Sequence, residues 1–464
     1  MSSPVIEELD AARRFADRWL ASLPTRPVGV PADPAALRAA LGDLPDDGLP
    51  AAGVLDDLAA ALEPGLVASG GPRYFGFVTG GTLPVALAAD WMVTAADQDA
   101  AVAVMSPAAA VVEEVAGRWA LDLLGLPTDA AVGFATGAQT ANIACLAAAR
   151  HALLAAAGHD VEADGLAGAP PVTVLVGAAG HATVLQALRL LGFGARHAVR
   201  VPADAQGAML PDALAAALDA APGPVLVCAQ AGQVNTGACD PLDAIADVVR
   251  ARENAWLHVD GAFGLWAAAS PTRRHLVAGA DRADSWAVDA HKWLNVPYDS
   301  ALAVVRDRAA LATAMSVSAP YLPLGEQDPS TRTLENSRRA RGVPVYAALR
   351  TLGRQGVADL VDRCCDLAAR AAERFAGHAE VVNDVVLNQV LVRFPGVDVA
   401  GLARAVAEDG TCWVGTTVWD GVPALRFSVS NWSTTTADVD LSVDRILALS
   451  GRGAAGPGSR GTAR

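Results

Sequence analysis

The feature that most constrains the fold is the alternation of short β-branched runs with helical patterns between about Pro72 and Val305. Four of these runs, VTVLVG, VLVCAQ, WLHVD and ALAVV, begin at residues 172, 225, 256 and 301. Short apolar runs separated by helix-length segments are typical of parallel strands joined by helical crossovers. The sequence therefore predicts an α/β fold with a mostly parallel central sheet that is covered on both faces.

The segments on either side of this region have a different pattern. Residues 1–71 contain helix-like stretches separated by Pro- and Gly-rich connectors, which predicts an N-terminal helical arm. Residues 72–340 form the predicted large α/β domain. Residues 341–450 combine helical patterns with the strand-like VVLNQVLVRF and ALRFSVSN, which predicts a small C-terminal α+β domain. Its last helix is expected near Thr435, capped with the help of Asp438. The Gly-rich residues 451–464 are expected to be disordered.

Charge and composition exclude several classes of partner. The 464 residues carry a net charge of −15, which opposes nucleic acid and anionic lipid surfaces. Hydrophobic residues make up 52% of the chain, yet polar residues interrupt uncharged stretches such as 130–149, so no bilayer span is expected. The first ten residues include acidic ones, so no secretory signal is expected, and six scattered cysteines have no metal-binding spacing. We therefore expect a cytoplasmic protein with reduced thiols and no metal site.

Polar residues that directly follow strands are the candidates for chemistry, because ligands of open α/β sheets bind outside the carboxyl ends of the strands. In FATGAQTANIACLAAAR, Gly137 opens a turn and Gln139 begins a helix whose free N–H groups suit a phosphate, although such helix entries are also common packing. His181 follows the next strand and could stack on an aromatic ring or exchange a proton, but single histidines are more often structural. Asp260 ends an apolar strand and could alternatively cap the next segment.

The fourth candidate is Lys292, in the segment SWAVDAHKWLNVPYDS. An amine desolvated between Trp286 and Trp293 could lose its proton and form a Schiff base with an aldehyde cofactor. Pyridoxal phosphate uses this linkage together with an acid at its pyridine nitrogen, a role open to Asp260. The 32 residues from Asp260 to Lys292 leave room for one crossover between neighbouring strand ends. A surface lysine is the alternative, and the joint occurrence of all four candidates favours the cofactor site.

At these residues the chain resembles the group II pyridoxal-phosphate-dependent amino-acid decarboxylases, which act on aromatic amino acids, histidine or glutamate. HVDGAFG is similar to the strand-end HVDAA motif of that family, DAHKWLNVPYDS to its cofactor-lysine motif, and GHATVLQAL to the segment whose histidine stacks on the cofactor. The likeness spans about residues 74–436. It implies a PLP-dependent transferase-like fold of type I, a small-molecule amino-acid substrate, and a homodimer with sites at the subunit interface.

The resemblance also implies roles for individual residues. Lys292 would hold the cofactor, Asp260 would pair with the pyridine nitrogen, and His181 and Ala262 would cover the two faces of the ring. The phosphate would be held by the turn and helix start at Gly137, Ala138 and Gln139, with help from His291. Thr79 would border the substrate, with Phe77 as a nearby apolar wall.

The sequence leaves the substrate and the product open. Family members usually carry a tyrosine on a mobile loop that reprotonates the α-carbon, but residues 322–341 contain none, and Tyr321, His181 or a water is left as the proton donor. Decarboxylation of an L-amino acid is the main prediction; the alternatives are transamination, aldehyde-forming decarboxylation, carbon–carbon cleavage or, less favoured, a non-catalytic scaffold. An acidic substrate would require a cation such as Arg338, Arg339 or Arg341, and an aromatic one apolar walls such as Phe75, Phe77 and Trp91.

Overall fold

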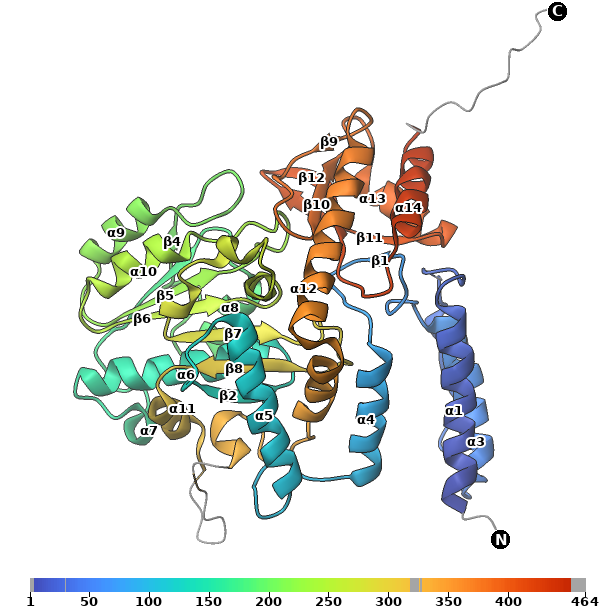
Figure 1. Cartoon of the computed structure of the whole chain (residues 1–464), viewed down its shortest axis with the longest axis horizontal. Coiled ribbons are helices and arrows are strands. Elements are labelled where there is room, and N and C mark those ends of the chain that lie inside the picture. Colours follow the sequence, from blue (N-terminus) through green and yellow to red (C-terminus); the bar gives the residue numbers. More distant parts are fainter. Residues whose placement is uncertain (1–3, 30, 318–324, 326–327, 452–464) are drawn as a thin grey trace, which may run out of the picture.

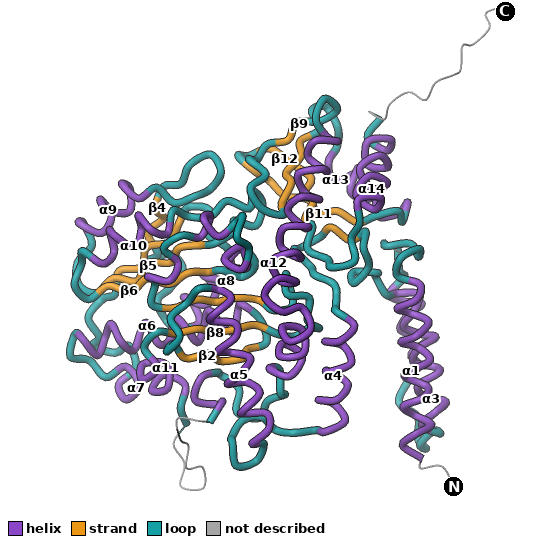
Figure 2. Tube along the Cα trace, in the orientation of Figure 1, coloured by secondary structure: helices purple, strands orange, loops and turns teal. Residues whose placement is uncertain are grey.

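The computed structural model describes residues 4–29, 31–317, 325 and 328–451 (Figure 1). Its centre is a seven-stranded sheet with helices on both sides (Figure 2). The strands follow the order β2 (Ala131–Ala135), β8 (Ala301–Val305), β7 (Ser285–Asp289), β6 (Ala255–Asp260), β5 (Val225–Gln230), β3 (Thr173–Gly177) and β4 (Val199–Val201). Among them only β8 runs antiparallel to its two neighbours. The predicted mostly parallel sheet is confirmed.

Successive residues of the central strands enter two different cores, which explains why these strands are continuously apolar. Leu226 and Cys228 of β5 pack on one face of the sheet, while Val225 and Val227 pack on the other. Both sets are buried. The helices around the sheet are α5 (Pro107–Leu124), α6 (Ala138–Ala156), α7 (Val161–Asp164), α8 (Ala182–Leu190), α9 (Pro211–Ala220), α10 (Leu242–Arg250) and α11 (Arg308–Met315), and α4 (Pro84–Ala96) lies farther out.

A second sheet of five strands contains pieces from both ends of the chain. Its order is β1 (Tyr74–Phe75), β11 (Trp413–Trp419), β12 (Val422–Ser428), β10 (Gln389–Arg393) and β9 (Glu380–Val381). The short strand β1 runs parallel to β11, with Tyr74 opposite Trp413 and Phe75 opposite Val414. The loop that follows β1 is thereby fixed to the small sheet.

The helix α12 (Gly342–Phe375) leads from the large sheet to the small one. The helix is interrupted at Gly353, whose φ is 61°. The small sheet is accompanied by α13 (Val399–Asp409) and α14 (Thr436–Leu449). The predicted cap of α14 is confirmed, because Thr435 and Asp438 form a reciprocal capping box.

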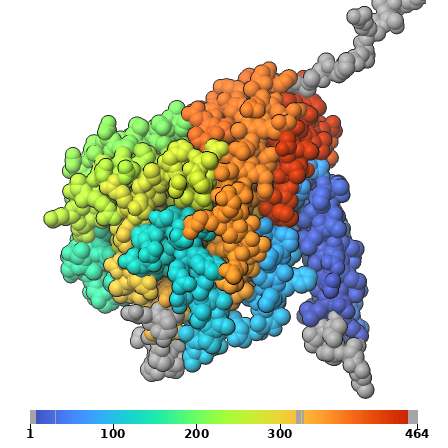
Figure 3. All heavy atoms as spheres, viewed as in Figure 1, coloured from blue at the N-terminus to red at the C-terminus, as the bar shows by residue number. Residues whose placement is uncertain are grey.

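The N-terminal arm consists of α1 (Pro4–Ser22), α2 (Pro34–Leu41) and α3 (Ala51–Leu62). It lies along one side of the molecule, next to α4 and the small sheet (Figure 3). None of the described helices combines the length and apolar character that a membrane crossing requires. The tail predicted to be disordered lies, from residue 452 onward, outside the described residues.

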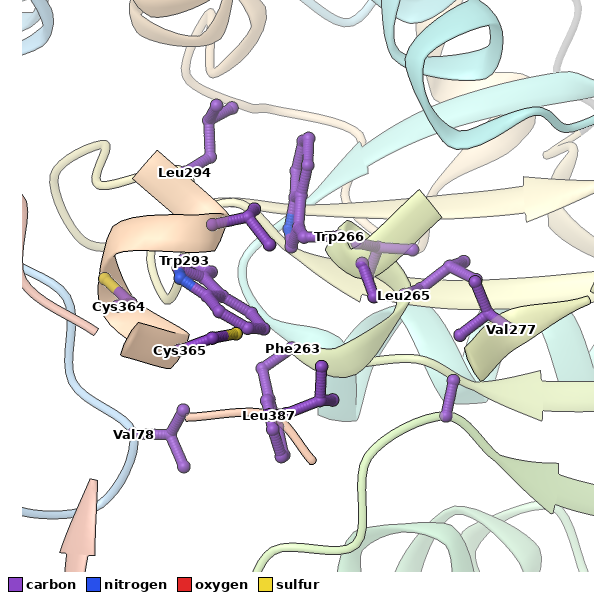
Figure 4. Packing of buried hydrophobic residues seen from close by; sticks show 14 of the residues in the cluster. Val78, Phe263, Leu265, Trp266, Val277, Trp293, Leu294, Cys364, Cys365 and Leu387 are labelled. Atoms are coloured by element: carbon purple, nitrogen blue, oxygen red, sulfur yellow. The ribbon is translucent and has the colours of Figure 1, made fainter. Parts of the chain in front are cut away.

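Large buried side chains pack directly behind Lys292. Trp293, which is only 1% exposed, packs beside Cys364 and Cys365 of α12 (Figure 4). Phe263, which follows β6, and Val78, which follows β1, belong to the same cluster. Burying a side chain of this size stabilises by roughly 1.5–3 kcal/mol, so Trp293 anchors the backbone of the preceding lysine.

Candidate functional site: a cavity at the carboxyl edge of the large sheet

A cavity of about 240 Å³ opens where the parallel strands of the large sheet end. Segments that follow β2, β3, β5, β6 and β7 contribute to it, which is the edge at which ligands bind in open α/β sheets. Its lining residues are Gly137, Ala138, Gln139, His181, Thr183, Gln230, Gly232, Val234, Asp260, Ala262, Phe263, Asp289, His291 and Lys292.

One wall of the cavity is the N-terminus of α6. Gly137 is the N-cap residue, and it provides no side chain to cap the N–H groups of the first turn. The amide oxygen and nitrogen of Gln139 are buried and have no hydrogen-bond partner among the described residues. Free N–H groups, the helix dipole and an unsatisfied amide together suit an anionic ligand group.

Asp260, at the end of β6, is 6% exposed. Its Oδ1 accepts a hydrogen bond from the Ala262 N–H at 3.2 Å. Burial raises the pKa of this carboxyl, and the nearby charges of His181 and Lys292 act in the opposite direction. A cationic ligand nitrogen at this position would stabilise the ionised carboxylate.

His181 is the N-cap of α8 and is exposed where it lines the cavity. Its Nδ1 accepts a hydrogen bond from the Thr183 N–H at 3.3 Å, so the proton of the neutral ring lies on Nε2. Removal of water by the surrounding walls lowers the pKa of His181. A lowered pKa favours the neutral ring, which is suited to stacking on a flat ligand.

Lys292, Asp289 and His291 form a polar cluster at the end of β7. Lys292 Nζ lies 3.0 Å from Asp289 Oδ2, and His291 Nε2 lies 3.5 Å from Asp289 Oδ1. The other ring nitrogen of His291 accepts from the Ser300 N–H at 3.3 Å. Burial lowers the pKa of His291. The cluster joins the lysine to the N-terminus of α6, because Asp289 Oδ1 also accepts from the Ala138 N–H at 2.6 Å.

Asn295 ties the lysine segment to two other parts of the chain. Its Oδ1 accepts from the N–H groups of Gly81 at 2.8 Å and Trp432 at 2.9 Å. Its Nδ2 donates to the carbonyls of Trp293 and Ser430, each at 2.9 Å. All of these groups would cost free energy if buried without a partner, so the loop after β1 and the segment before α14 are held against the lysine.

Comparison with known proteins identifies the family. Residues 34–394, more than half of the chain, match the family model described as the pyridoxal-dependent decarboxylase conserved domain. The chain belongs to this family. Tryptophan decarboxylase 1 of Oryza sativa subsp. japonica is 29% identical over 415 residues, which cover 81% of this chain and 80% of the relative. L-2,4-diaminobutyrate decarboxylase of Rhizobium meliloti is 31% identical over 384 residues, 78% of this chain and 74% of the relative.

The structures of family members agree with this membership. A crystal structure of Oryza sativa TDC with PLP and tryptamine matches with a TM-score of 0.90 and 26% identity over 97% of this chain and 98% of that chain. A structure of Rhodiola rosea 4-hydroxyphenylacetaldehyde synthase has the same fold, with a TM-score of 0.84 at 22% identity over 96% of this chain and 98% of that chain. The predicted family, the type I fold and pyridoxal phosphate as cofactor are confirmed, and this decarboxylase is a carboxy-lyase that acts on amino acids.

The cavity of this decarboxylase brings together the residues that the sequence predicted for catalysis and cofactor binding. Lys292, Asp260, His181, Ala262, Gly137, Ala138, Gln139 and His291 all line it. The two predicted substrate residues do not line it. Thr79 is buried in the loop after β1, and Phe77 is 64% exposed and stacks on Trp413 at 5.3 Å between ring centroids.

The arginines and aromatic residues that the sequence offered for substrate binding do not line this cavity. Arg338, Arg339 and Arg341 are paired with Glu113, Asp90 and Asp299 respectively. Phe75 is fully buried against Phe427, and Trp91 lines a different cavity, between α1 and α4. Tyr321 and most of the loop that follows it lie outside the described residues.

Two charged residues near the site were missed at the sequence level. Asp289 ends the apolar run SWAVD, which is the pattern that singled out Asp260, so the same rule applied to β7 would have found it. Arg426 of β12 is 8% exposed, and its charge is close enough to lower the pKa of His181. No local pattern distinguishes it from a surface arginine of a strand.

The residues present fit pyridoxal phosphate. The unsatisfied amide of Gln139 and the N-terminus of α6 suit its phosphate, the buried Asp260 suits its pyridine nitrogen, and Lys292 supplies an amine. These four features lie in one cavity, and each would be paired with a complementary group of this cofactor.

Proposed function

We propose that Lys292 holds pyridoxal phosphate covalently and that the decarboxylase removes the α-carboxylate of an L-amino acid. The observation that carries the proposal is the meeting of Lys292, Asp260, His181 and the start of α6 in one cavity. When bound, the cofactor supplies an electron sink for the pair of electrons released as the carboxylate leaves.

Each residue has a distinct task in this proposal. Asp260 remains ionised and keeps the ring nitrogen protonated, which increases the electron demand of the ring. His181 and Ala262 hold the ring between them, and the α6 N-terminus with Gln139 and His291 holds the phosphate. Orienting the scissile bond in this way converts binding energy into rate.

Arg426 is proposed as the cation that binds the α-carboxylate of the substrate. It is a buried guanidinium with no ion-pair partner among the described residues, and its Nε has no hydrogen-bond partner there. Burial lowers its pKa, because removal of water disfavours the charged guanidinium. A carboxylate that enters the cavity beside His181 would supply the missing partner.

The charges around the site support a substrate with an uncharged side chain. The three arginines considered for an acidic side chain are engaged in ion pairs, of which Arg338 with Glu113 is fully buried. In contrast, Phe77, on the loop that packs against Lys292, stacks on Trp413 of β11 and forms an aromatic surface outside the cofactor cavity. We propose that this surface and Thr79 border the substrate side chain.

We also propose that the decarboxylase is a cytoplasmic homodimer. The family resemblance and the arm at the side of the molecule support the dimer, and the six free cysteines support a reducing compartment. Light scattering after size exclusion tests the dimer. A monomer that is fully active would refute it.

The test of the function is a panel of L-amino acids with separate measurement of CO₂, amine, aldehyde and oxo-acid. We expect CO₂ and amine, a yellow protein, and a mass increase at Lys292 after borohydride reduction. A Lys292→Ala variant should be colourless and inactive. Oxo-acid without CO₂ would favour transamination, aldehyde would favour the oxidative alternative, and an unlabelled Lys292 would refute the proposal.

A further inference from the structure

Asp289 makes three contacts at the point where the cofactor's phosphate is expected. Its carboxylate is 2% exposed. Oδ1 accepts from the Ala138 N–H at 2.6 Å and lies 3.5 Å from His291 Nε2, and Oδ2 lies 3.0 Å from Lys292 Nζ. The enzyme therefore places a carboxylate of its own at the N-terminus of α6.

The carboxylate of Asp289 and the phosphate of the cofactor would both occupy this helix N-terminus and repel each other. The N-terminus of a helix stabilises negative charge, and a carboxylate already uses its first N–H group here. The nearest cation is the ammonium of Lys292, and a covalent link to the cofactor removes that amine from Asp289. The neighbouring His291 adds little positive charge, because burial lowers its pKa. Asp289 thus loses a partner and gains a like charge when the cofactor enters.

We propose that Asp289 competes with the phosphate of the cofactor for the N-terminus of α6 while it also holds Lys292. The inference rests on the proposed function, in which Lys292 and α6 hold the cofactor. In the cofactor-free enzyme the carboxylate fixes the ammonium of Lys292 against the helix. The same carboxylate receives the side chain of Lys292 each time a substrate amine displaces it. Asp289 accordingly weakens cofactor binding and provides a resting position for the freed lysine.

The test is the isosteric variant Asp289→Asn, whose amide oxygen still accepts from the Ala138 N–H but carries no charge. Its matched control is Asp284→Asn at the opposite end of β7, where the carboxylate accepts from the Leu257 N–H at 2.8 Å. Apoenzymes prepared with hydroxylamine are titrated with pyridoxal phosphate and with pyridoxal, which lacks the phosphate. Binding is followed by absorbance and protein fluorescence.

We expect the Kd of Asp289→Asn for pyridoxal phosphate to fall by about tenfold or more, which corresponds to about 1.4 kcal/mol. The Kd for pyridoxal should fall less, because only the phosphate meets the lost charge. Inorganic phosphate should raise the melting temperature of the variant apoenzyme at lower concentrations than it does for the wild type. Asp284→Asn should bind both compounds as the wild type does.

An unchanged or higher Kd of Asp289→Asn for pyridoxal phosphate would overturn the inference, as would equal gains for the two compounds. Asp289→Ser, which also removes the charge, gives the same comparison where the asparagine variant does not fold. Borohydride labelling separates the two levels: an unlabelled Lys292 in the wild type refutes the proposed function. A labelled Lys292 with an unchanged affinity ratio refutes only the role of Asp289.

Discussion

Gly80 lies against the backbone of the cofactor lysine, where a larger residue would not fit. A Cβ at this position would lie 2.0 Å from the carbonyl oxygen of Lys292 and 3.2 Å from that of His291. These are backbone atoms, so no side-chain rotation relieves the clash. The loop after β1 and the lysine segment must separate by more than about 1 Å before ordinary van der Waals contact is restored.

The variant Gly80→Ala should therefore lose both stability and rate. Overpacking of this kind costs about 1–3 kcal/mol of unfolding free energy. A displacement of about 1 Å at a reacting group lowers the rate by about 100-fold. We expect kcat/KM for CO₂ release to fall by this factor, while borohydride still labels Lys292 because the amine remains present.

The matched control is Gly53→Ala in α3, where an added Cβ meets no atom within 4 Å. This change should leave kcat/KM unchanged and stabilise the arm by about 0.4–1 kcal/mol. Both variants are measured by CO₂ release and by denaturant unfolding. A Gly80→Ala enzyme with wild-type kcat/KM would refute the reasoning, because the two backbones could then separate without moving the lysine.

Three further outcomes follow from buried titratable groups. Glu113→Gln should lower the unfolding free energy by about 3–5 kcal/mol in urea, because Arg338 then keeps a buried charge without its partner, and adding Arg338→Met should recover most of the loss. Burial lowers the pKa of His258 to about 3 in the folded protein. As the pH falls below about 6.5, this histidine is protonated in the unfolded chain but not in the folded one, so folding becomes less favourable. Melting temperatures should fall between pH 6.5 and 4, and more steeply in the wild type than in His258→Gln. Arg426→Met should raise KM at least about tenfold with the cofactor absorbance intact, and Arg426→Lys should recover part of the affinity; an unchanged KM would exclude a carboxylate contact.

Much of the site was predictable because its residues obey a local rule. Asp260 and His181 each follow an apolar strand, and the carboxyl ends of parallel strands meet at one edge of the sheet. The start of α6 after Gly137 follows from turn and helix propensities in the same way. Such features depend on neighbours in sequence, so the pattern alone brings them together.

The rest depends on contacts between distant segments. Strand β1 has two residues, too few for a pattern, and exists because β11 pairs with it. Phe77 and Thr79 belong to the loop fixed by that pairing. No local sequence pattern therefore shows that they lie outside the cofactor cavity. Arg426 became a candidate only through its burial near His181, which no property of β12 reveals.

The pairing of β1 with β11 also sets an order of assembly. Tyr74 leaves the ribosome long before Trp413, and at about 5–20 residues per second the interval is on the order of tens of seconds. During that time the large sheet can form, but the loop that carries Gly80 has no strand to hold it beside Lys292. We expect the nascent enzyme to bring this loop against Lys292 last, after the small sheet closes, so that truncation within β11 would leave a large sheet whose cofactor lysine lacks the neighbouring loop.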